Sequence, residues 1–262
     1  MFDFVTFAAD RLQLFLLILL RASGLFLIAP LLSNKMFPTQ AKVGLVILIG
    51  IIMVSTIGTT SVPPVMTLSD LIAVAAKELL VGLSIGFVFS LLMIGVQAAG
   101  DIVSYQIGFS LAEVLDPQSG VATTTLGQFW LLLASLIFLT LNGHHLIITA
   151  FSNSYEVIPP AKVALTGSAV ELILTYSAYV FVIGLKIAAP VIVTLLLTDV
   201  AMGTLSRLMP TMNVFVLGFG LKVGIGLVIM AMSLPVFAYV LEKSTTMLNN
   251  ELGRLMVALG KA

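Results

Sequence analysis

The stretch Arg207–Gly226, RLMPTMNVFVLGFGLKVGIG, decides what kind of fold this chain can adopt. It places Arg, Pro, Asn, Lys and four glycines directly against or inside an apolar run. A charge at the centre of a bilayer costs about 2.5–3.5 kcal/mol even on insertion scales, so these polar groups must face protein or water. The stretch therefore indicates a membrane-embedded chain that belongs to an assembly or lines a pathway.

The composition of the whole chain agrees with this interpretation. Of its 262 residues, 60% are hydrophobic and only 9% are charged, whereas soluble domains carry about 25% charged residues. The 12 basic and 12 acidic residues give a net charge of zero, so the chain lacks the excess of positive charge that is typical of nucleic-acid-binding proteins. The absence of cysteine excludes disulfides and thiolate metal sites. Because Asp3 and Asp10 stand where a signal peptide would be cationic, we expect the first apolar run to be retained.

Six apolar segments follow one another and predict an all-α fold. A helix that spans about 30 Å of hydrocarbon needs about 20 residues. The second and fourth segments are too short for this, whereas the third and fifth are too long and carry charges. We therefore expect one domain over residues 1–262, built from membrane-associated helical hairpins of unequal length that contact lipid only in part. The segments are Leu12–Leu32, Val43–Ile57, Leu71–Ala99, Leu126–Leu141, Val170–Thr198 and Val214–Leu241.

Eight charged residues lie within or at the ends of these segments. The favoured interpretation is that they pair across helices and fix the register of a packed bundle. The alternatives are that some line an ion or proton path, or that they reach the membrane surface along their aliphatic stems. Neighbours such as Lys77 and Glu78 lie about 100° apart on a helix and should reach different partners. The eight are Arg21, Lys77, Glu78, Asp101, Glu171, Lys186, Asp199 and Lys222.

Two pairs of glycines have the spacing that lets helix backbones approach closely. Gly82 and Gly86 form one pair, and Gly220 and Gly224 form the other. The GxxxG spacing is frequent, but here both pairs lie in helices that also carry charges, which favours tight helix–helix packing as their role.

The middle of the chain, residues 101–125, is the most loop-like segment. Gly108 can end the preceding helix, residues 116–120 (DPQSG) are typical of a turn, and residues 123–125 (TTT) offer N-caps for the next helix. An ordinary connector is the simplest interpretation. A hydrophobic plug is the functional alternative, because apolar constrictions block water and ions. Its apolar residues would be Phe109, Leu111, Val114 and Leu115.

Catalytic and metal-binding patterns are absent from the sequence. The two histidines, His144 and His145, are adjacent and have no evident carboxylate partner. HExxH, GxSxG, P-loop and GxGxxG motifs do not occur. We expect no enzyme, no metal site and no cofactor, and a role for the histidines in helix capping or interhelical hydrogen bonding.

The polar C-terminal segment, residues 242–262, carries one apolar face. Leucines recur there at steps of four, three and four residues, which predicts an amphipathic helix. It would lie on the membrane surface or dock on a partner protein. Its balanced charges make docking the favoured alternative. The leucines are Leu248, Leu252, Leu255 and Leu259.

Taken in order, these landmarks resemble the FliR family of flagellar biosynthesis proteins and its counterparts in virulence type III secretion. The resemblance covers nearly the whole chain, and the Asn-Gly-His and Arg-x-x-Pro-x-x-Asn-Val-Phe blocks are its most specific parts. Thr211 stands where Gln is common in the family, and Gly220 where Pro is common. The matching residues are Arg21–Gly24 with Pro30, Lys77-Glu78, Gly82 and Gly86, Gly100–Phe109, Asp116-Pro117, Leu141–His145 (with Asn142 and His144), Ala189-Pro190, Arg207–Pro210, and Met212–Phe215 (with Asn213).

The resemblance implies a non-enzymatic subunit of the flagellar protein export gate in the inner membrane, within the basal body. In the family, FliR joins FliP and FliQ in a helical complex through which unfolded flagellar proteins pass, and FlhB associates with it. A central loop plugs the closed pore, and residues 107–118 are its counterpart here. The buried polar residues Arg21, Lys77, Glu78 and Lys222 would then form ion pairs between subunits as well as within the chain.

An alternative from another class is a secondary transporter or ion channel that works alone. In that case Glu171, Lys186 and Asp199 would bind the coupling ion. An intramembrane enzyme is a more distant alternative, because it would need a nucleophile and a base close together and the sequence shows no such pair.

Overall fold

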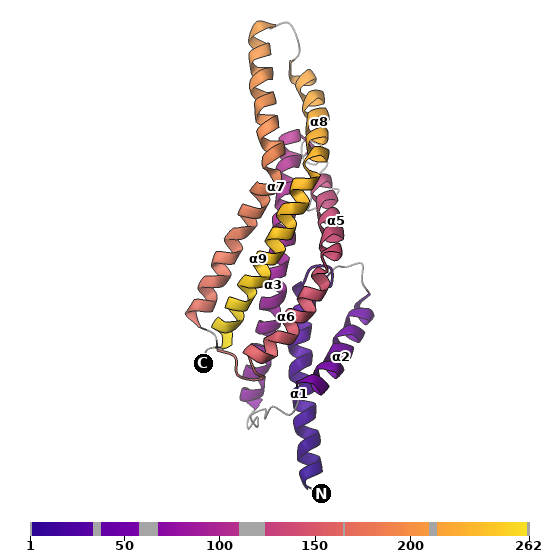
Figure 1. Cartoon of the computed structure of the whole chain (residues 1–262), viewed down its shortest axis with the longest axis vertical. Coiled ribbons are helices and arrows are strands. Elements are labelled where there is room, and N and C mark those ends of the chain that lie inside the picture. The colour runs from indigo at the N-terminus through magenta and orange to yellow at the C-terminus, as the bar shows by residue number, and fades with distance from the viewer. Residues whose placement is uncertain are drawn as a thin grey trace. The chain divides into compact units, whose positions relative to one another are not determined.

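The described part of the chain folds into helices (Figure 1). The computed structural model describes residues 2–33, 38–57, 68–109, 124–164, 166–209 and 214–260, with side chains from residue 11 onward and without those of 214–216. Within these ranges the regular secondary structure is entirely helical, which confirms the predicted all-α class. The helices are α1 (Phe2–Ile28), α2 (Thr39–Thr56), α3 (Leu68–Ile107), α5 (Thr125–Thr140), α6 (Gly143–Val157), α7 (Gly167–Leu208), α8 (Val214–Met232) and α9 (Leu234–Gly260).

The helices differ in length as the apolar segments predicted. Four are long and apolar enough to cross a membrane: α1 from Arg11, α2, α3 and α7. The pairs α5–α6 and α8–α9 are bent by 65° and 53°. If the two helices of each bent pair are counted as one span, the described residues contain up to six spans. Whereas α2 has 18 residues, α3 has 40 and α7 has 42. A membrane span needs about 20 residues, so α3 and α7 are each about twice that length.

Local sequence explains where several helices begin and end. The Thr124 hydroxyl accepts a hydrogen bond from the Gly127 amide and caps the N-terminus of α5, so the N-cap predicted within residues 123–125 is confirmed. Asn142 takes a left-handed conformation with φ of 56° and separates α5 from α6. Pro235 lies in the first turn of α9, where its missing N–H removes no helical hydrogen bond.

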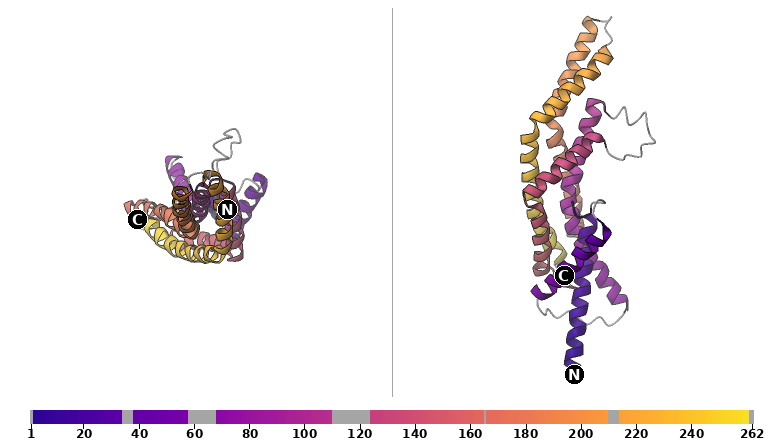
Figure 2. Two further views of the ribbon diagram at one scale, coloured as in Figure 1. Left: turned by 90° about the horizontal axis from the view of Figure 1, so that it is seen from above. Right: turned by 90° about the vertical axis from the view of Figure 1, so that its right-hand side faces the viewer.

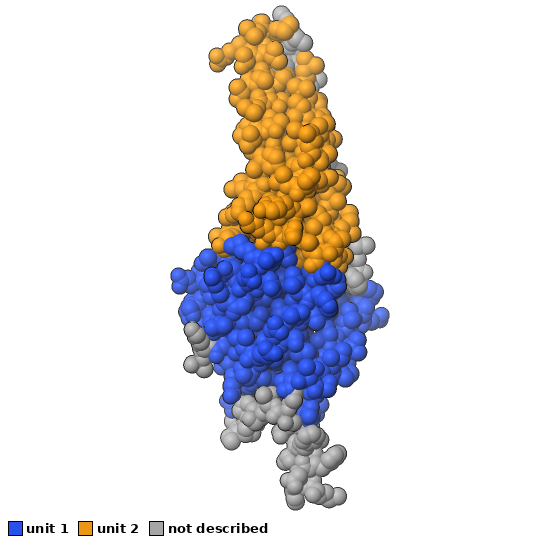
Figure 3. Space-filling view, viewed as in Figure 1, with its two compact units in different colours: residues 1–91, 142–177, 245–262 blue, residues 92–141, 178–244 orange. Residues whose placement is uncertain are grey.

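Packing divides the chain into two compact units (Figure 3). Unit 1 comprises Met1–Leu91, Asn142–Ser177 and Thr245–Ala262, and unit 2 comprises Leu92–Leu141 and Ala178–Ser244. Each unit is therefore assembled from segments that are far apart in the sequence. The single domain expected from the sequence stays a prediction.

In unit 1, α1 and α3 lie side by side with their backbones in contact (Figures 1 and 2). A Cβ atom added at Gly82 would overlap the carbonyl oxygen of Arg21. One added at Gly24 would lie 2.5 Å from the carbonyl oxygen of Leu79, and one at Gly86 would lie 3.0 Å from the amide nitrogen of Ala29. Only glycine fits at positions 24 and 82, and position 86 is tightly packed. Around these contacts pack the buried side chains Leu17, Ile18, Leu25, Ile85, Val88 and Phe89.

The C-terminal helix corrects one expectation. Its leucine face is covered by unit 1 itself, because Leu248, Leu252, Leu255 and Leu259 are each at most 4% exposed. Thr166 donates its hydroxyl to the carbonyl oxygen of Ala258 at 2.9 Å, which ties the helix to the start of α7. Our expectation that the membrane surface or a partner protein covers this face was therefore wrong. A period of apolar residues shows that a face is buried but does not identify what covers it.

Unit 2 is held together by a second set of close contacts. A Cβ atom added at Gly100 in α3 would lie 2.5 Å from the Cα atom of Gly127 in α5. The rings of Trp130 and Phe237 have centroids 5.3 Å apart, so α9 packs on α5. The end of α7 and helix α8 form a helical hairpin in this unit (Figures 1 and 2).

Candidate functional site

The densest group of buried polar side chains surrounds Arg21 in unit 1. Its Nε donates to Glu78 Oε2 at 2.7 Å, and both side chains are 0% exposed. Its two terminal nitrogens donate to the Ser154 hydroxyl at 3.0 Å and to the carbonyl oxygen of Ile158 at 3.1 Å. One guanidinium group therefore joins α1 to α3, to α6 and to the turn that follows α6.

Further contacts complete this cluster. The guanidinium carbon of Arg21 lies 4.0 Å from the centroid of the Tyr155 ring, a favourable cation–π geometry. The second carboxylate oxygen of Glu78 accepts a hydrogen bond from the Ala161 amide at 2.8 Å. Ala161 has φ of 66°, a left-handed conformation that is strained for a residue with a side chain. The carboxylate thus also holds the turn after α6 in place.

The chemistry of the Arg21 cluster is structural. Both oxygens of the Glu78 carboxylate accept bonds from the protein, and the charges of Arg21 and Glu78 cancel. A buried pair of this kind is tolerated only when its hydrogen bonds are satisfied, and its attested use is to fix one register among several. The cluster fixes which turn of α1 faces α3, and it leaves neither of its two charged groups unpaired.

Lys77, the neighbour of Glu78, points to a different environment. Its side chain is half-buried and forms neither an ion pair nor a hydrogen bond with the described residues. The two neighbours therefore do not share one partner, as expected for residues about 100° apart on a helix.

A second ion pair lies in unit 2. Lys222 Nζ in α8 is 2.5 Å from Asp199 Oδ1 in α7, with the two side chains 26% and 38% exposed. Gln106 in α3 donates its side-chain amide to the other oxygen of Asp199 at 3.3 Å. Three helices of unit 2 therefore meet at one carboxylate.

The arrangement gives no support to a coupling ion bound by Glu171, Lys186 and Asp199. Asp199 is already neutralised by Lys222, and Lys186 lies 13 residues earlier on the same helix, about 20 Å along its axis. Glu171 is exposed and belongs to unit 1. In the described parts of the chain, no group of three or more His, Cys, Asp or Glu side chains is placed to hold a metal ion.

Asp101 anchors the start of α5 to the end of α3. Its Oδ1 accepts hydrogen bonds from the Thr124 hydroxyl at 2.8 Å and from the Thr124 amide at 3.3 Å. Gly108, with φ of 101°, lies just after the last residue of α3, as its predicted role as a helix breaker requires. Phe109 is half-buried in the turn that follows. The other predicted plug residues, Leu111, Val114 and Leu115, lie outside the described residues, so the plug stays a prediction.

The second glycine pair faces open space. No described atom lies within 4 Å of a Cβ atom added at Gly220 or Gly224. Both line a shallow apolar groove on α8 of about 410 Å³, together with Leu221, Ile225, Val228 and Ile229. Close packing at these glycines stays a prediction, because no described part of this chain supplies the second helix.

Residues 12–248 match the family model described as "Bacterial export proteins, family 1". The chain belongs to this family. Among curated relatives, it is 31% identical over 255 residues to the flagellar biosynthetic protein FliR of Bacillus subtilis, covering 95% of this chain and 96% of that protein. It is 31% identical over 227 residues to FliR of Escherichia coli (87% and 86%) and 30% identical over 224 residues to FliR of Caulobacter vibrioides (86% and 89%).

These likenesses confirm the resemblance to the FliR family that the sequence motifs indicated. With its apolar, span-length helices, the chain is a membrane protein of flagellar biosynthesis and of the bacterial export family.

The residues that carry the FliR family resemblance lie in different surroundings. Asn142 precedes α6 as its N-cap residue. His144 is exposed and stacks on His145, with ring centroids 5.9 Å apart. Arg207 is exposed in the last turn of α7. Pro210 and Asn213 lie outside the described residues.

Sequence reasoning missed several members of the two charge clusters in this FliR family chain. Ser154 and Tyr155 carry no motif, and Ala161 takes part through its backbone amide. Gln106 falls within the Gly100–Phe109 family block but gave no signal of pairing with Asp199. The Pro159-Pro160 pair was the available signal, because it ends a helix and so exposes backbone groups that a buried charge can bind.

Proposed function

We propose that this chain is a subunit of the flagellar type III protein export gate and forms, with FliP and FliQ homologues, the channel for unfolded flagellar proteins. A homologue of FlhB would associate with this complex. The gate would lie in the inner, cytoplasmic membrane, within the flagellar basal body. The proposal includes that the chain is not an enzyme and uses no cofactor, in line with relatives named as biosynthetic proteins.

One observation carries most of this proposal: Lys186 is exposed in the middle of a broad apolar surface. It lies near the centre of the 42-residue helix α7. Val182, one turn before it on the helix, is 41% exposed, and Phe181 and Leu185 on the flanking side of α7 are 72% and 56% exposed. The ammonium group of Lys186 forms neither an ion pair nor a hydrogen bond with the described residues.

A surface of this kind fits a protein partner better than lipid. A lysine in the hydrocarbon core costs about 2.5–3.5 kcal/mol even on insertion scales. A side chain about 20 residues from either end of its helix is far from the membrane interface that would hydrate it. A carboxylate on another subunit would remove this cost, and the open groove at Gly220 and Gly224 would admit a close-packed helix.

Co-purification of the tagged chain tests the proposal. We expect a heteromeric complex that contains FliP and FliQ homologues, identified by mass spectrometry and visible as particles of one shape. Lys186→Glu should reduce the recovered complex at least about tenfold. Lys243→Glu, which reverses another exposed lysine outside the apolar stretch of α7, should leave the yield unchanged. A chain that purifies as a monomer or symmetric oligomer, with no unlike subunit, would favour the lone-transporter alternative.

A further inference from the structure

Contacts between the second half of α7 and α8 in unit 2 define the register of a helical hairpin. Lys222 in α8 pairs with Asp199 in α7. Four residues later in α8 and four earlier in α7, a Cβ atom added at Gly226 would lie 3.8 Å from a methyl group of Leu195. The two helices are therefore antiparallel, and each step back along α7 is matched by a step forward along α8 (Figures 1 and 2).

This register places a weak point of each helix at the same level. Pro190, five residues before Leu195, lies level with the last residues of α8, five positions after Gly226. Pro190 has no N–H, so the carbonyl oxygen of Lys186 loses its helical hydrogen bond. On the other side, α8 ends at Met232 and turns by 53° into α9. Helices bend at such positions, so the hairpin is interrupted on both sides at one level.

We call the part of the hairpin beyond this level, residues 191–209 and 214–232, the arm. At the base of the arm, Val191 is 0% exposed. Farther out along α7 the packing ends: each of the residues 200–209 is exposed, except Met202, which is half-buried. In α7, therefore, packing is concentrated at the base of the arm.

The end of α3 makes two contacts with the arm, which we call the latch. Gln106 donates its side-chain amide to Asp199 at 3.3 Å, a long hydrogen bond. Next to it, Ile107 fills a notch at Gly226, where an added Cβ atom would lie 2.6 Å from its Cδ1 atom. Asp199 is nine residues beyond Pro190, about 14 Å along the helix. A contact at this distance from the interrupted level opposes rotation of the arm about it.

We propose that the arm turns as one body about a hinge at the level of Pro190 and Met232, and that the latch holds it in the position shown. The ion pair between Asp199 and Lys222 joins the two helices of the arm, so they move together. A rotation of about 10° would displace Ser206, about 24 Å from Pro190, by about 4 Å. Side chains at the base hardly move in such a rotation and stay packed. The hinge is a property of this chain and does not depend on the export function.

Distances between spin labels on the full-length chain in detergent, measured by double electron–electron resonance, test this inference. The chain has no cysteine, so cysteines introduced at Ser206 in the arm and at Leu132 in α5, both exposed, are the only labelling sites. We expect one narrow distance distribution for the otherwise unchanged chain. Gln106→Leu removes one latch contact and Gly226→Ala displaces Ile107, so each should broaden this distribution at least about twofold.

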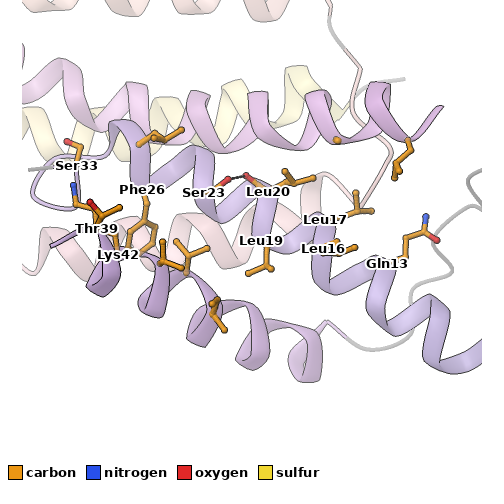
Figure 4. A pocket seen from close by; sticks show the side chains of 16 residues that line it. Gln13, Leu16, Leu17, Leu19, Leu20, Ser23, Phe26, Ser33, Thr39 and Lys42 are labelled. Atoms are coloured by element: carbon orange, nitrogen blue, oxygen red, sulfur yellow. Dashed lines mark hydrogen bonds between the residues drawn. The ribbon is translucent and has the colours of Figure 1, made fainter. Parts of the chain in front are cut away.

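Each latch variant has a matched control. Gln97→Leu replaces another half-buried glutamine of α3. Gly224→Ala adds a methyl group to α8 where no described atom lies within 4 Å. Both controls should leave the distribution unchanged. A second label pair, at Leu16 and Ile47, lines an apolar groove between α1 and α2 in unit 1 (Figure 4). Its distance should stay the same in every variant, which separates hinge motion from general loosening of the chain.

A third substitution tests the hinge itself. Pro190→Ala restores the N–H that can bond to the carbonyl oxygen of Lys186, so it should stiffen α7. Combined with Gln106→Leu, it should return the distribution to nearly its original width. If Gly226→Ala does not fold, Gln106→Leu decides, because it removes a single hydrogen bond and adds no bulk. An unchanged width in Gln106→Leu would overturn the proposal. So would broadening that Pro190→Ala does not reduce, or equal broadening of the label pair in unit 1.

Discussion

Arg21 and Glu78 form an ion pair at 2.7 Å in which neither side chain has any exposed surface. Removing one member of such a pair leaves an unpaired buried charge and costs about 3–5 kcal/mol, whereas replacing both by apolar residues costs far less. We therefore expect Arg21→Met and Glu78→Met each to lower the free energy of unfolding by about 3–5 kcal/mol. The double variant should lose much less than the sum of the two. Thermal unfolding in detergent, analysed as a double-mutant cycle, measures this coupling.

The neighbouring residue provides a matched control for this cycle. Lys77→Met changes the charge one position away, where the side chain is half-buried and has no bond to the described residues. It should change the stability of the isolated chain by less than about 1 kcal/mol. Equal losses for Lys77→Met and Arg21→Met would contradict a special role for the buried pair.

The contact between α1 and α3 predicts a large effect for one methyl group. In Gly82→Ala, the new Cβ atom would overlap the carbonyl oxygen of Arg21, so the helices must move apart. Overpacking of this kind costs about 1–3 kcal/mol, and the movement would also lengthen the Arg21–Glu78 contact. We expect a lower melting temperature and a lower yield of folded protein.

Another glycine distinguishes this clash from an ordinary change in helix propensity. Gly253 lies in α9, and no described atom is within 4 Å of a Cβ atom added there. Gly253→Ala should therefore stabilise the chain, by up to about 1 kcal/mol, because alanine favours a helix more than glycine. A melting temperature that falls equally in both variants would rule out the helix contact as the cause.

The pair formed by Asp199 and Lys222 should matter more for assembly than for the stability of the chain. Its side chains are 38% and 26% exposed, and ion pairs with such access to solvent contribute about 0–1 kcal/mol. We expect Lys222→Ala to lower the yield of the heteromeric complex several-fold, because the open face of α8 would lose its fixed position against α7. The charge-reversed double variant Asp199→Lys/Lys222→Asp should recover much of this yield. Wild-type yield with altered conductance would instead indicate a role in permeation.

Local patterns in the sequence predicted most of the helices, but not α6 (Gly143–Val157), which lies outside the six apolar segments. Apolar runs predict helices because every backbone group in a bilayer must find its partner within the chain, and the N-cap near Thr124 follows from its hydroxyl. One break was missed. The sixth segment, Val214–Leu241, was treated as continuous, but α8 ends at Met232 and α9 begins at Leu234 after a bend of 53°. Pro235 was the available signal.

Contacts between distant segments could not be predicted in the same way. Arg21 and Ser154 are separated by 133 positions, and no periodicity within one helix specifies which other helix lies beside it. The buried leucine face of α9 gives the same lesson. Leu252 and Leu255 show that the helix has an apolar side, yet only the fold shows that α9 packs within unit 1. Side-chain pattern is local, whereas packing partners depend on the topology of the whole chain.

Deleting residues 108–115 should leave the complex assembled and make it permeable to ions and small solutes. The deletion removes Phe109, Leu111, Val114 and Leu115, the apolar residues predicted to block the pore by excluding water. It spares Asp101 and Thr124, whose hydrogen bond anchors the start of α5, so assembly should persist. Replacing Leu111, Val114 and Leu115 by serine keeps the length of the segment and should also raise conductance in reconstituted vesicles. If both complexes form intact particles and remain as impermeable as wild type, these residues are not the plug.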